Sequence, residues 1–462
     1  MNIKHLAIAT CIGIAVPTIA HANTNELSIE QRLARLEERT LAAEKRAELA
    51  EQRAAKLENA LKQNQALNNN LSQTSETITA PPSSLIETNT GYGKLKLYGD
   101  VEFNTDIASK KGQLTSINMR SGKEKDYGDY DKWGINGRIL IGLDGERLLD
   151  NKNYAGFTVQ PLANIDGKVS LDDAAFYFGK KERWQFKLGR YEAYDMFPLN
   201  QDTFVEYSGN TANDTYSDGF GYIYMMKEGR GRSNSGGSMM FNSQYNNWYF
   251  ETNLLIEDGT SIFTNKEYHG NKLYNNKNVI YFRPVIAWNN NNFKVAVALE
   301  KNIINNAYGY DDKKTGEFRE QSKRNGYGLT LGWSNLQQNP ENGVTVNWNT
   351  AYLDANDEND FTTGTNILWR KLQLGYIYAH NNIKSYTINS DDDDNNNDII
   401  FGPGKYNIHT LYSSYELPNI LDMDNFKIYL GAYYSVINGK DIEIENSDKD
   451  RYGVRARFKY FF

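Results

Sequence analysis

The chain ends in a segment, residues 454–462, in which apolar and basic side chains alternate strictly. The apolar set is Val454, Ala456, Phe458, Tyr460 and Phe462, and the basic set is Arg455, Arg457 and Lys459. A period of two places these two sets on opposite faces of a β-strand. An apolar outer face combined with a charged inner face is typical of a barrel that has lipid outside and water inside.

A matching strand is predicted far upstream, near residues 94–107. One of its faces carries Leu95, Leu97, Val101 and Phe103, and the other carries Lys94, Lys96, Tyr98, Asp100 and Glu102. Two such strands at the ends of one segment can pair with each other and leave no open edge in hydrocarbon. We therefore predict an all-β transmembrane barrel that is closed by its first and last strands.

The turn pattern predicts 16 antiparallel strands, because short turns and long loops then alternate between the two ends of the barrel. The predicted strands are 94–107, 133–147, 153–163, 171–180, 184–192, 236–245, 248–257, 278–289, 292–301, 324–335, 342–354, 362–370, 372–381, 406–416, 425–437 and 450–462. The segment 220–226 also has the pattern of a strand, but counting it would give an odd number. We place it inside the connection 193–235; a second strand hidden there would give 18. Pro284 predicts a bulge or a shifted boundary in its strand.

The amino terminus has the features of an export signal, which we assign to residues 1–22. Lys4 precedes the apolar stretch 6–19, and a small residue, Ala22, ends the predicted cleavage site. A membrane-anchoring helix is the alternative, but the apolar run is short and contains Pro17. The single cysteine, Cys11, lies inside this peptide, so the mature chain has no disulfide.

Residues 23–71 are predicted to form a periplasmic coiled-coil helix. Positions of a heptad seam carry Ile29, Leu33, Leu36, Thr40, Ala43, Ala47, Ala50, Ala54, Leu57, Leu61, Asn64 and Leu71. Several successive small residues bury little area, so the seam favours an assembly of several copies over an isolated helix; a solitary charged helix is the alternative. Residues 72–92, which are rich in Ser, Thr and Asn, are predicted to form a linker without fixed structure. The predicted barrel domain covers residues 93–462.

Composition and charge support a membrane barrel. The 462 residues include 32 Tyr, 20 Phe and 7 Trp but only 9 Pro, and we expect the aromatic side chains to form girdles at the lipid interfaces. A soluble secreted β protein is the alternative. Removing residues 1–22 takes away one lysine and changes the formal net charge from −7 to −8. This charge argues against nucleic acid as a partner.

The connection 193–235 is the most informative loop, because it carries aromatic side chains that need a surface to pack against. We predict that it folds into the lumen and forms a constriction, since a 16-stranded barrel would otherwise have a wide hole. The predicted constriction residues are Glu192, Tyr194, Asp195, Phe197, Asp202, Phe204, Glu206 and Tyr207. An external loop at contacts between subunits is the alternative.

Opposite this loop we expect a basic inner wall formed by Lys94, Lys96, Arg138, Arg455, Arg457 and Lys459. Asp195, Asp202 and Glu206 would then face the basic residues of the last strand, and opposed charges across a narrow slot would favour polar solutes. Candidate aromatic side chains on the lumen wall are Tyr98, Tyr177, Tyr249, Tyr281, Tyr429 and Tyr433. Each can be either a sugar subsite or an ordinary wall residue.

No enzyme, metal or cofactor site is predicted. The mature chain has three histidines: His269 in an external loop, His380 at a strand end and His409 on an inward face. The sequence has no Gly-x-Ser-x-Gly motif and no histidine pair at metal-ligand spacing. The acidic run 391–394 lacks the Gly and the terminal Glu of an EF-hand loop, which favours a solvated loop.

The signal peptide, the short heptad helix that carries residues 28–33, and a barrel ending in Tyr460-Phe461-Phe462 resemble the raffinose-type glycoporins. The sucrose porins similarly place a coiled coil before the barrel. The resemblance covers the mature chain and implies a homotrimeric outer-membrane porin that passes oligosaccharides, with its folded-in loop at the constriction. The expected partners are oligosaccharides and small polar solutes, outer-membrane lipid and lipopolysaccharide. A general diffusion porin, or a tether or adhesin at the cell wall, are the alternatives.

Overall fold

The computed structural model of the protein divides into two compact units, residues 1–70 and 71–462, and all described residues lie in the second. The described residues are 85–108, 132–201, 224–226, 231–233, 235–263, 266–268, 271–312, 315–384, 403–440 and 450–462. The predicted signal peptide, the coiled coil and the acidic run 391–394 lie outside them. Among the described residues, no helix is long and apolar enough to cross a bilayer.

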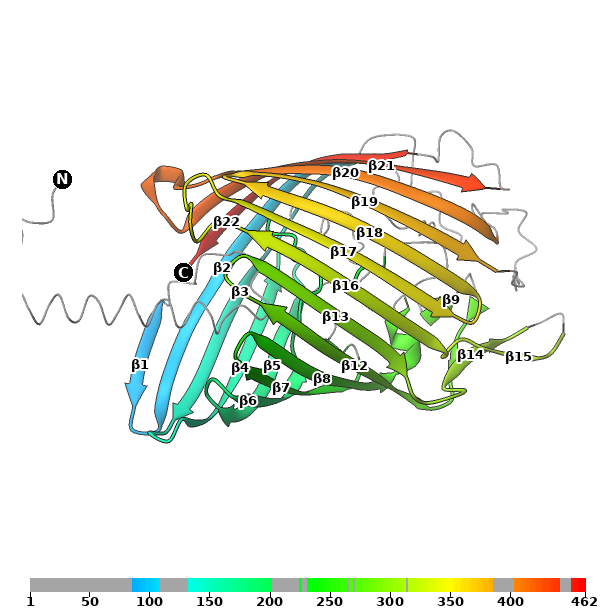
Figure 1. The fold of residues 1–462 in the computed structure, drawn as a ribbon, viewed down its shortest axis with the longest axis horizontal. Coiled ribbons are helices and arrows are strands. Elements are labelled where there is room, and N and C mark those ends of the chain that lie inside the picture. The colour runs from blue at the N-terminus through cyan, green and yellow to red at the C-terminus, as the bar shows by residue number, and fades with distance from the viewer. Residues whose placement is uncertain are drawn as a thin grey trace, which may run out of the picture. The chain divides into compact units, whose positions relative to one another are not determined.

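Sixteen long antiparallel strands close into a barrel, in which each strand pairs with its neighbours along the chain (Figure 1). They are β2 (Gly93–Ala108), β3 (Lys132–Leu148), β4 (Asn153–Asn164), β5 (Val169–Lys180), β6 (Trp184–Arg190), β7 (Gly237–Tyr245), β8 (Trp248–Asp258), β12 (Asn278–Asn289), β13 (Phe293–Asn302), β16 (Arg324–Ser334), β17 (Val344–Ala355), β18 (Glu358–Trp369), β19 (Leu372–Ile383), β20 (Gly404–Leu417), β21 (Phe426–Lys440) and β22 (Asp450–Phe461).

The first and last of these strands close the barrel. β2 pairs with β22 from Asp100–Phe461 to Ala108–Gly453, as the alternation of both strands predicts. β6 pairs directly with β7, so the connection between them contributes no strand to the barrel wall. The prediction of 16 strands is therefore confirmed, and the alternative of 18 is wrong.

Tight turns gather at one end of the barrel, which we call the short-turn end, and longer connections gather at the other, the long-loop end. At the short-turn end, Asn246 and Arg370 adopt positive φ angles of 51° and 55°, which let two strands reverse within two residues. At the long-loop end, connections form short strands of their own: β9 (Glu267–Tyr268), β10 (Asn271–Lys272), β11 (Tyr274–Asn275), β14 (Tyr308–Asp311) and β15 (Phe318–Glu320), with the 3₁₀ turn η3 (Gly259–Ile262). A second 3₁₀ turn, η5 (Ile420–Asp422), lies in the short-turn connection between β20 and β21.

The last part of the predicted linker is a strand, which corrects our expectation that 72–92 has no fixed structure. β1 (Ile86–Thr90) pairs antiparallel with β2, from Ile86–Leu97 to Thr90–Gly93. It follows directly beyond the point where β22 stops, because Phe462 bonds to Gly99 of β2 through both backbone groups, at 2.8 and 3.0 Å. β1 thus covers an edge of β2 that β22 is too short to reach.

Pro284 does not produce the expected bulge. It pairs in register with Thr252 of β8, and the register between β12 and β13 is the same on both sides of it. A ladder irregularity lies instead between β4 and β5, between Val159 and Pro161. Proline removes a backbone donor in both places, and only at Pro161 is the missing bond accompanied by a register shift.

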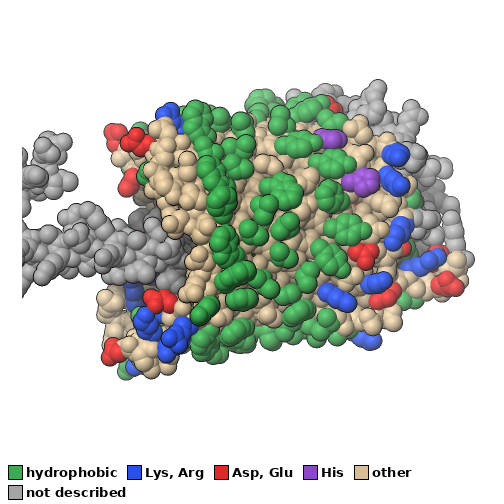
Figure 2. Space-filling view, in the orientation of Figure 1, with side chains coloured by type: hydrophobic (Ala, Val, Ile, Leu, Met, Phe, Trp, Pro, Cys, Tyr) green, Lys and Arg blue, Asp and Glu red, His purple; other side chains and the backbone are tan. Residues whose placement is uncertain are grey.

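The outer surface is apolar over a broad band, with charged side chains towards both ends (Figure 2). Exposed side chains of this band include Ile141, Phe250, Leu374 and Leu430. Tryptophan gathers mainly at the short-turn end, where five of the seven lie within two residues of a turn: Trp184, Trp248, Trp288, Trp333 and Trp369. This is one aromatic girdle, whereas Trp133 lies at the long-loop end and Trp348 in mid-strand.

His409 is outward, not inward as we predicted. Its neighbour Ile408 is buried on the inner face, and His409 Nδ1 lies 2.7 Å from the hydroxyl of Tyr376 on the outer face of β19. A period of two places residues 406, 408 and 410 on one face of the strand and residues 407 and 409 on the other, so the predicted inward face of His409 is wrong.

Candidate pore lining and constriction

The connection between β6 and β7 enters the barrel. Its first residues, 191–201, which we call the inserted segment, are almost all buried, and Tyr191, Met196, Phe197 and Leu199 have no exposed surface. A loop exposed to solvent would not bury apolar side chains so completely.

The backbone of the inserted segment bonds to the inner faces of β16–β19. Side-chain amides there take the place of a neighbouring strand, which satisfies buried backbone groups that have no ladder of their own. The bonds are Asn349 Nδ2 to Met196 O (3.1 Å), Asn366 Nδ2 to Pro198 O (2.8 Å), Asn347 Nδ2 to Pro198 O (3.3 Å), Gln201 N to Gln373 Oε1 (2.6 Å), and Gln373 Nε2 to Leu199 O.

The side chains of the inserted segment form a core with residues 224–226 and with the barrel wall. This core contains Phe197, Met225 and Met226, together with small and aliphatic inward side chains such as Ala298 and Ile377. Glycines make room for it. A Cβ at Gly328 of β16 would lie 2.6 Å from Met226 Sδ, and one at Gly364 of β18 would lie 2.9 Å from Met225 Cε. The inner wall from β12 to β21 is therefore shaped to hold the loop, and we call it the filled half of the lumen.

Tyr194 attaches the inserted segment to the part of the wall formed by β8. Its ring stacks on Tyr249 of β8 at 5.4 Å between centroids, Lys294 Nζ lies 4.7 Å from the ring centre, and its backbone N donates to Glu251 Oε1 at 3.5 Å. Burial raises the pKa of the Tyr194 hydroxyl, and the charge of Lys294 opposes this effect. Tyr194 thus remains a neutral packing group at physiological pH.

The connection returns to the wall through Arg232. Its guanidinium pairs with Asp172 (2.8 Å) and Asp173 (3.1 Å) of β5 and with Glu192 (2.8 Å) at the start of the connection. Burial opposes the charge of Arg232, but these three carboxylates outweigh that effect and raise its pKa. This cluster links both ends of the connection, because Arg190 also donates to Ser233 O.

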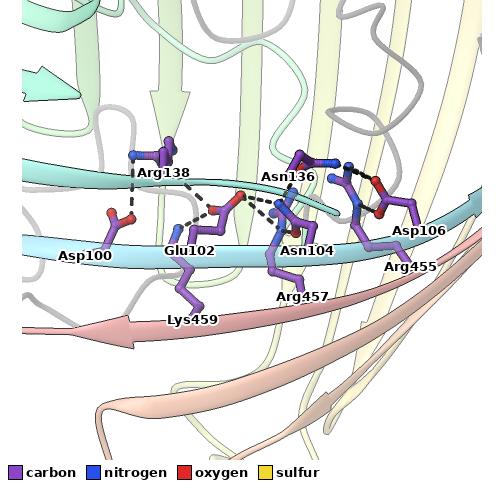
Figure 3. Close-up of polar contacts among 9 residues, drawn as sticks. All are labelled: Asp100, Glu102, Asn104, Asp106, Asn136, Arg138, Arg455, Arg457 and Lys459. Carbon is purple, nitrogen blue, oxygen red and sulfur yellow. Dashed lines mark hydrogen bonds and ion pairs between the residues drawn. The ribbon is translucent and has the colours of Figure 1, made fainter. Parts of the chain in front are cut away.

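The opposite wall carries a ladder of ion pairs across β22, β2 and β3, which we call the charged strip (Figure 3). Its members are Asp100, Glu102, Asn104 and Asp106 of β2, Asn136 and Arg138 of β3, and Arg455, Arg457 and Lys459 of β22. Register explains the pairing, because Glu102 lies directly between Lys459 and Arg138 and Asp106 lies directly opposite Arg455.

The distances show which charges of the strip are paired. Arg455 donates two hydrogen bonds to Asp106, from Nε to Oδ1 at 2.7 Å and from Nη2 to Oδ2 at 3.1 Å. Glu102 lies 3.5 Å from Arg457 Nε, 3.5 Å from Lys459 Nζ and 4.0 Å from Arg138 Nη2. Asn104 and Asn136 connect these two clusters, with Asn136 Nδ2 donating to Asp106 Oδ2 at 2.5 Å.

We predicted a basic inner wall. The strip carries three carboxylates beside its four basic groups, so the charge of this part of the wall is nearly balanced. Asp100 and Glu102 share a face of β2 with Lys96, and Glu102 offsets the charge of Arg457 and Lys459 of β22. Lys94 and Lys96 lie outside the strip, towards the short-turn end. Lys94 pairs with Glu87 of β1 at 2.7 Å, and Lys96 Nζ lies 5.1 Å from the ring centre of Tyr98.

The basic residues of β22 thus take their partners from the adjacent strand. Asp195 makes a local contact, since its Oδ1 accepts from the backbone N of Phe197 at 2.8 Å, and its side chain is 6% exposed. The other predicted constriction residues, Asp202, Phe204, Glu206 and Tyr207, lie outside the described residues.

The six candidate lumen tyrosines have different environments. Tyr281 is fully buried beneath the long-loop end, where its hydroxyl lies 3.1 Å from that of Tyr308. Tyr429 and Tyr433 are 6% and 5% exposed. Tyr249 packs under Tyr194, whereas Tyr98 and Tyr177 keep exposed surface on the inner wall of β2–β5.

Sequence reasoning missed the residues that hold the loop. These are Met196, Leu199, Tyr224, Met225, Met226 and the amides Asn347, Asn349, Asn366 and Gln373. A signal was present in β13, where residues 295–299 are apolar on both faces. An apolar inward face in a water-filled barrel requires a cover.

Within the described ranges, no group of three or more His, Cys, Asp or Glu side chains is arranged to hold a metal ion. The acids of the charged strip and those around Arg232 are bonded to basic partners.

A closed 16-stranded barrel with an apolar exterior and a charged lumen defines an outer-membrane porin. A family model described as porin-like glycoporin RafY matches residues 97–462. The chain therefore belongs to the porin-like glycoporin RafY family, which confirms the resemblance seen in the sequence.

Comparison with solved structures finds other outer-membrane proteins. One is a loop-deletion mutant of OmpT, an outer membrane protein of Vibrio cholerae, with 11% identity, a TM-score of 0.46 and coverage of 80% of this chain and 100% of that chain. Another is an anion-selective porin from Comamonas acidovorans, with 12% identity, a TM-score of 0.45 and coverage of 80% and 99%. A search of curated protein sequences finds no match.

Proposed function

We propose that this porin passes neutral oligosaccharides through the part of the lumen bordered by the charged strip. The nearly balanced charge of the strip, three carboxylates beside four basic groups, is the observation that carries this proposal. A wall with one net sign concentrates ions of the other sign, whereas paired charges attract neither strongly over distance. At contact, however, paired charges still offer strong donors and acceptors to hydroxyl groups.

The filled half supports a restricted passage. The inserted segment lies against β16–β19 inside a barrel whose size would otherwise leave a wide aqueous channel. We infer that this segment is the constriction and that solutes move between it and the wall of β22, β2 and β3. Sugar hydroxyls there exchange bonds with water for bonds with Asn104, Asn136 and the ion pairs, which lowers the cost of partial dehydration.

The assembly we propose follows from the sequence. Residues 1–22 act as an export signal, 23–71 form a periplasmic coiled coil, and three chains associate into a homotrimer in contact with lipopolysaccharide. The heptad seam of small and aliphatic residues supports this arrangement, because it becomes stable only when several copies lie side by side.

The test is swelling of liposomes that contain the purified protein, with a matched series of solutes. Mono-, di- and trisaccharides should all enter, and a trisaccharide should enter faster than a polyethylene glycol of the same hydrodynamic radius. An amino sugar and a sugar acid of equal ring size should enter at similar rates. Rates that depend on radius alone would indicate a general diffusion porin, and exclusion of trisaccharides would contradict the proposal.

A further inference from the structure

Two tyrosines on the inner wall lie over glycines of the next strand. A Cβ at Gly142 of β3 would lie 2.4 Å from Cζ of Tyr98, and one at Gly156 of β4 would lie 2.7 Å from Cζ of Tyr177. Each ring therefore occupies the space into which a side chain of the neighbouring strand would project. The missing Cβ lets the ring lie against the wall.

Hydrogen bonds fix the first ring in this position. The hydroxyl of Tyr98 donates to Asp144 Oδ1 at 3.0 Å and accepts from Gln160 Nε2 at 2.9 Å, and Thr158 Oγ1 donates to the same Asp144 oxygen at 2.6 Å. Three strands, β2, β3 and β4, thus contribute to one polar cluster beside an aromatic ring.

The second ring lies in a similar setting. Tyr177 of β5 is 6.0 Å from Tyr154 of β4 between centroids, and Lys181 Nζ lies 4.7 Å from the centre of Tyr154 and 3.0 Å from Glu146 Oε2. Aromatic surface, carboxylate and cation therefore recur along the wall. We call Tyr98, Asp144, Gln160 and Tyr177 the tyrosine platform.

The platform lies on the short-turn side of the charged strip, because Tyr98 precedes Asp100 along β2 and pairs with Gly142 of β3. Its two rings keep exposed surface, unlike the inward tyrosines at 281, 429 and 433, which are buried. A solute that passes the strip towards the short turns meets the platform next.

We propose that the tyrosine platform is a saccharide-binding subsite, a role that rests on the oligosaccharide function proposed above. The C–H face of a pyranose packs on the ring of Tyr98 or Tyr177, while its hydroxyls bond to Asp144 and Gln160.

An aromatic ring that covers a glycine also stabilises the sheet. If the two rings had only this role, they would be purely structural. The two roles differ in what they change. A structural ring affects the stability of the barrel, whereas a subsite affects the dwell time of sugar in the open channel and does so unequally from the two sides of the membrane.

The experiment records sugar-induced interruptions of ion current through single channels, with maltotriose as the probe. Tyr98→Ala and Tyr177→Ala should each shorten the maltotriose dwell time by roughly 2- to 10-fold, the range expected for one aromatic contact. Tyr98→Phe keeps the ring and should lose less. Tyr415→Ala, which removes an exposed tyrosine from the lipid face, is the matched control and should change nothing.

Sidedness sharpens the test. Maltotriose added at the short-turn side should interrupt current more often than at the long-loop side, because it reaches the platform before the strip. Unchanged dwell times in both alanine variants and in Asp144→Asn would overturn the subsite while sugar entry in liposomes continued. Absence of both entry and interruption in the wild-type porin would overturn the proposed function as well. Asp144→Asn provides a readout even if an alanine variant does not assemble.

Discussion

Two regions of the lumen wall share one outer pattern and differ inside: the filled half, and the wall of β22, β2 and β3 that carries the charged strip, which we call the charged half. From β12 to β21 the inward positions include Ala298, Leu353 and Ile377, and the inserted segment covers them. From β22 to β3 the inward positions carry Glu102, Arg457 and their partners in the charged strip. The same alternation thus builds a core on one side and a polar wall on the other.

This difference shows that an inward position in a porin has no fixed polarity, because its polarity depends on what faces it. An apolar inner wall is stable only if another part of the chain removes it from water. A charged inner wall is stable without a cover if each charge meets an opposite charge on the neighbouring strand, as Asp106 meets Arg455. The filled half thereby positions the loop, and the charged half is left for solutes.

The largest effect should come from placing a charge in the filled half. Phe197→Asp removes a fully buried ring, which alone costs about 3–5 kcal/mol, and it buries a carboxylate beside Met225 and Met226. We expect the inserted segment to leave the wall, so that single-channel conductance and the size limit for sugars both rise.

The matched control is Phe318→Asp, which changes an exposed phenylalanine of a long loop, 39% accessible, and should leave conductance unchanged. Heat-dependent mobility on a denaturing gel checks that the barrel itself remains closed in both variants. A Phe197→Asp channel that assembles with wild-type conductance would mean that the segment does not restrict the pore.

A smaller effect is expected from removing a charge in the charged half. Glu102→Gln leaves Arg457, Lys459 and Arg138 facing an uncharged amide, so the local field becomes positive. Anion preference in reversal-potential measurements should rise, and more so in dilute salt, because screening extends to about 30 Å at 0.01 M but only about 3 Å at 1 M.

Glu182→Gln is the control for this variant, since Glu182 forms an exposed ion pair with Lys152 in the short turns. It should leave selectivity as in the wild type. If Glu102→Gln also leaves selectivity unchanged, ions do not pass along the charged strip, and the charged half does not border their path.

Much of the fold could be predicted because local alternation and turn length determine it. The strands at 278–289 and 372–383 illustrate this. Both ends of the first strand were predicted without error, and the end of the second was predicted two residues early. β1 was not predicted, because five residues without a hydrophobic face carry little signal until β2 provides an edge to pair with.

The lumen was harder to predict because it depends on contacts between distant segments. Alternation identified Glu102 and Lys459 as inward, but only the register shows that they face each other across adjacent strands. Similarly, Asn349 and Gln373 have no distinguishing local pattern, and their role follows from the backbone of a loop more than 150 residues away, as the separations of 153 and 174 residues show.

The smallest effect is expected at Asp195. The sequence alone suggested that this carboxylate faces Arg455, Arg457 and Lys459 and sets cation preference. In the structure its Oδ1 accepts from Phe197 N at 2.8 Å, and an asparagine oxygen can accept the same bond. Asp195→Asn should therefore shift the reversal potential less than Glu102→Gln at 0.01 M salt. A larger shift would mean that the inserted segment, rather than the charged strip, sets the field along the path of the ions.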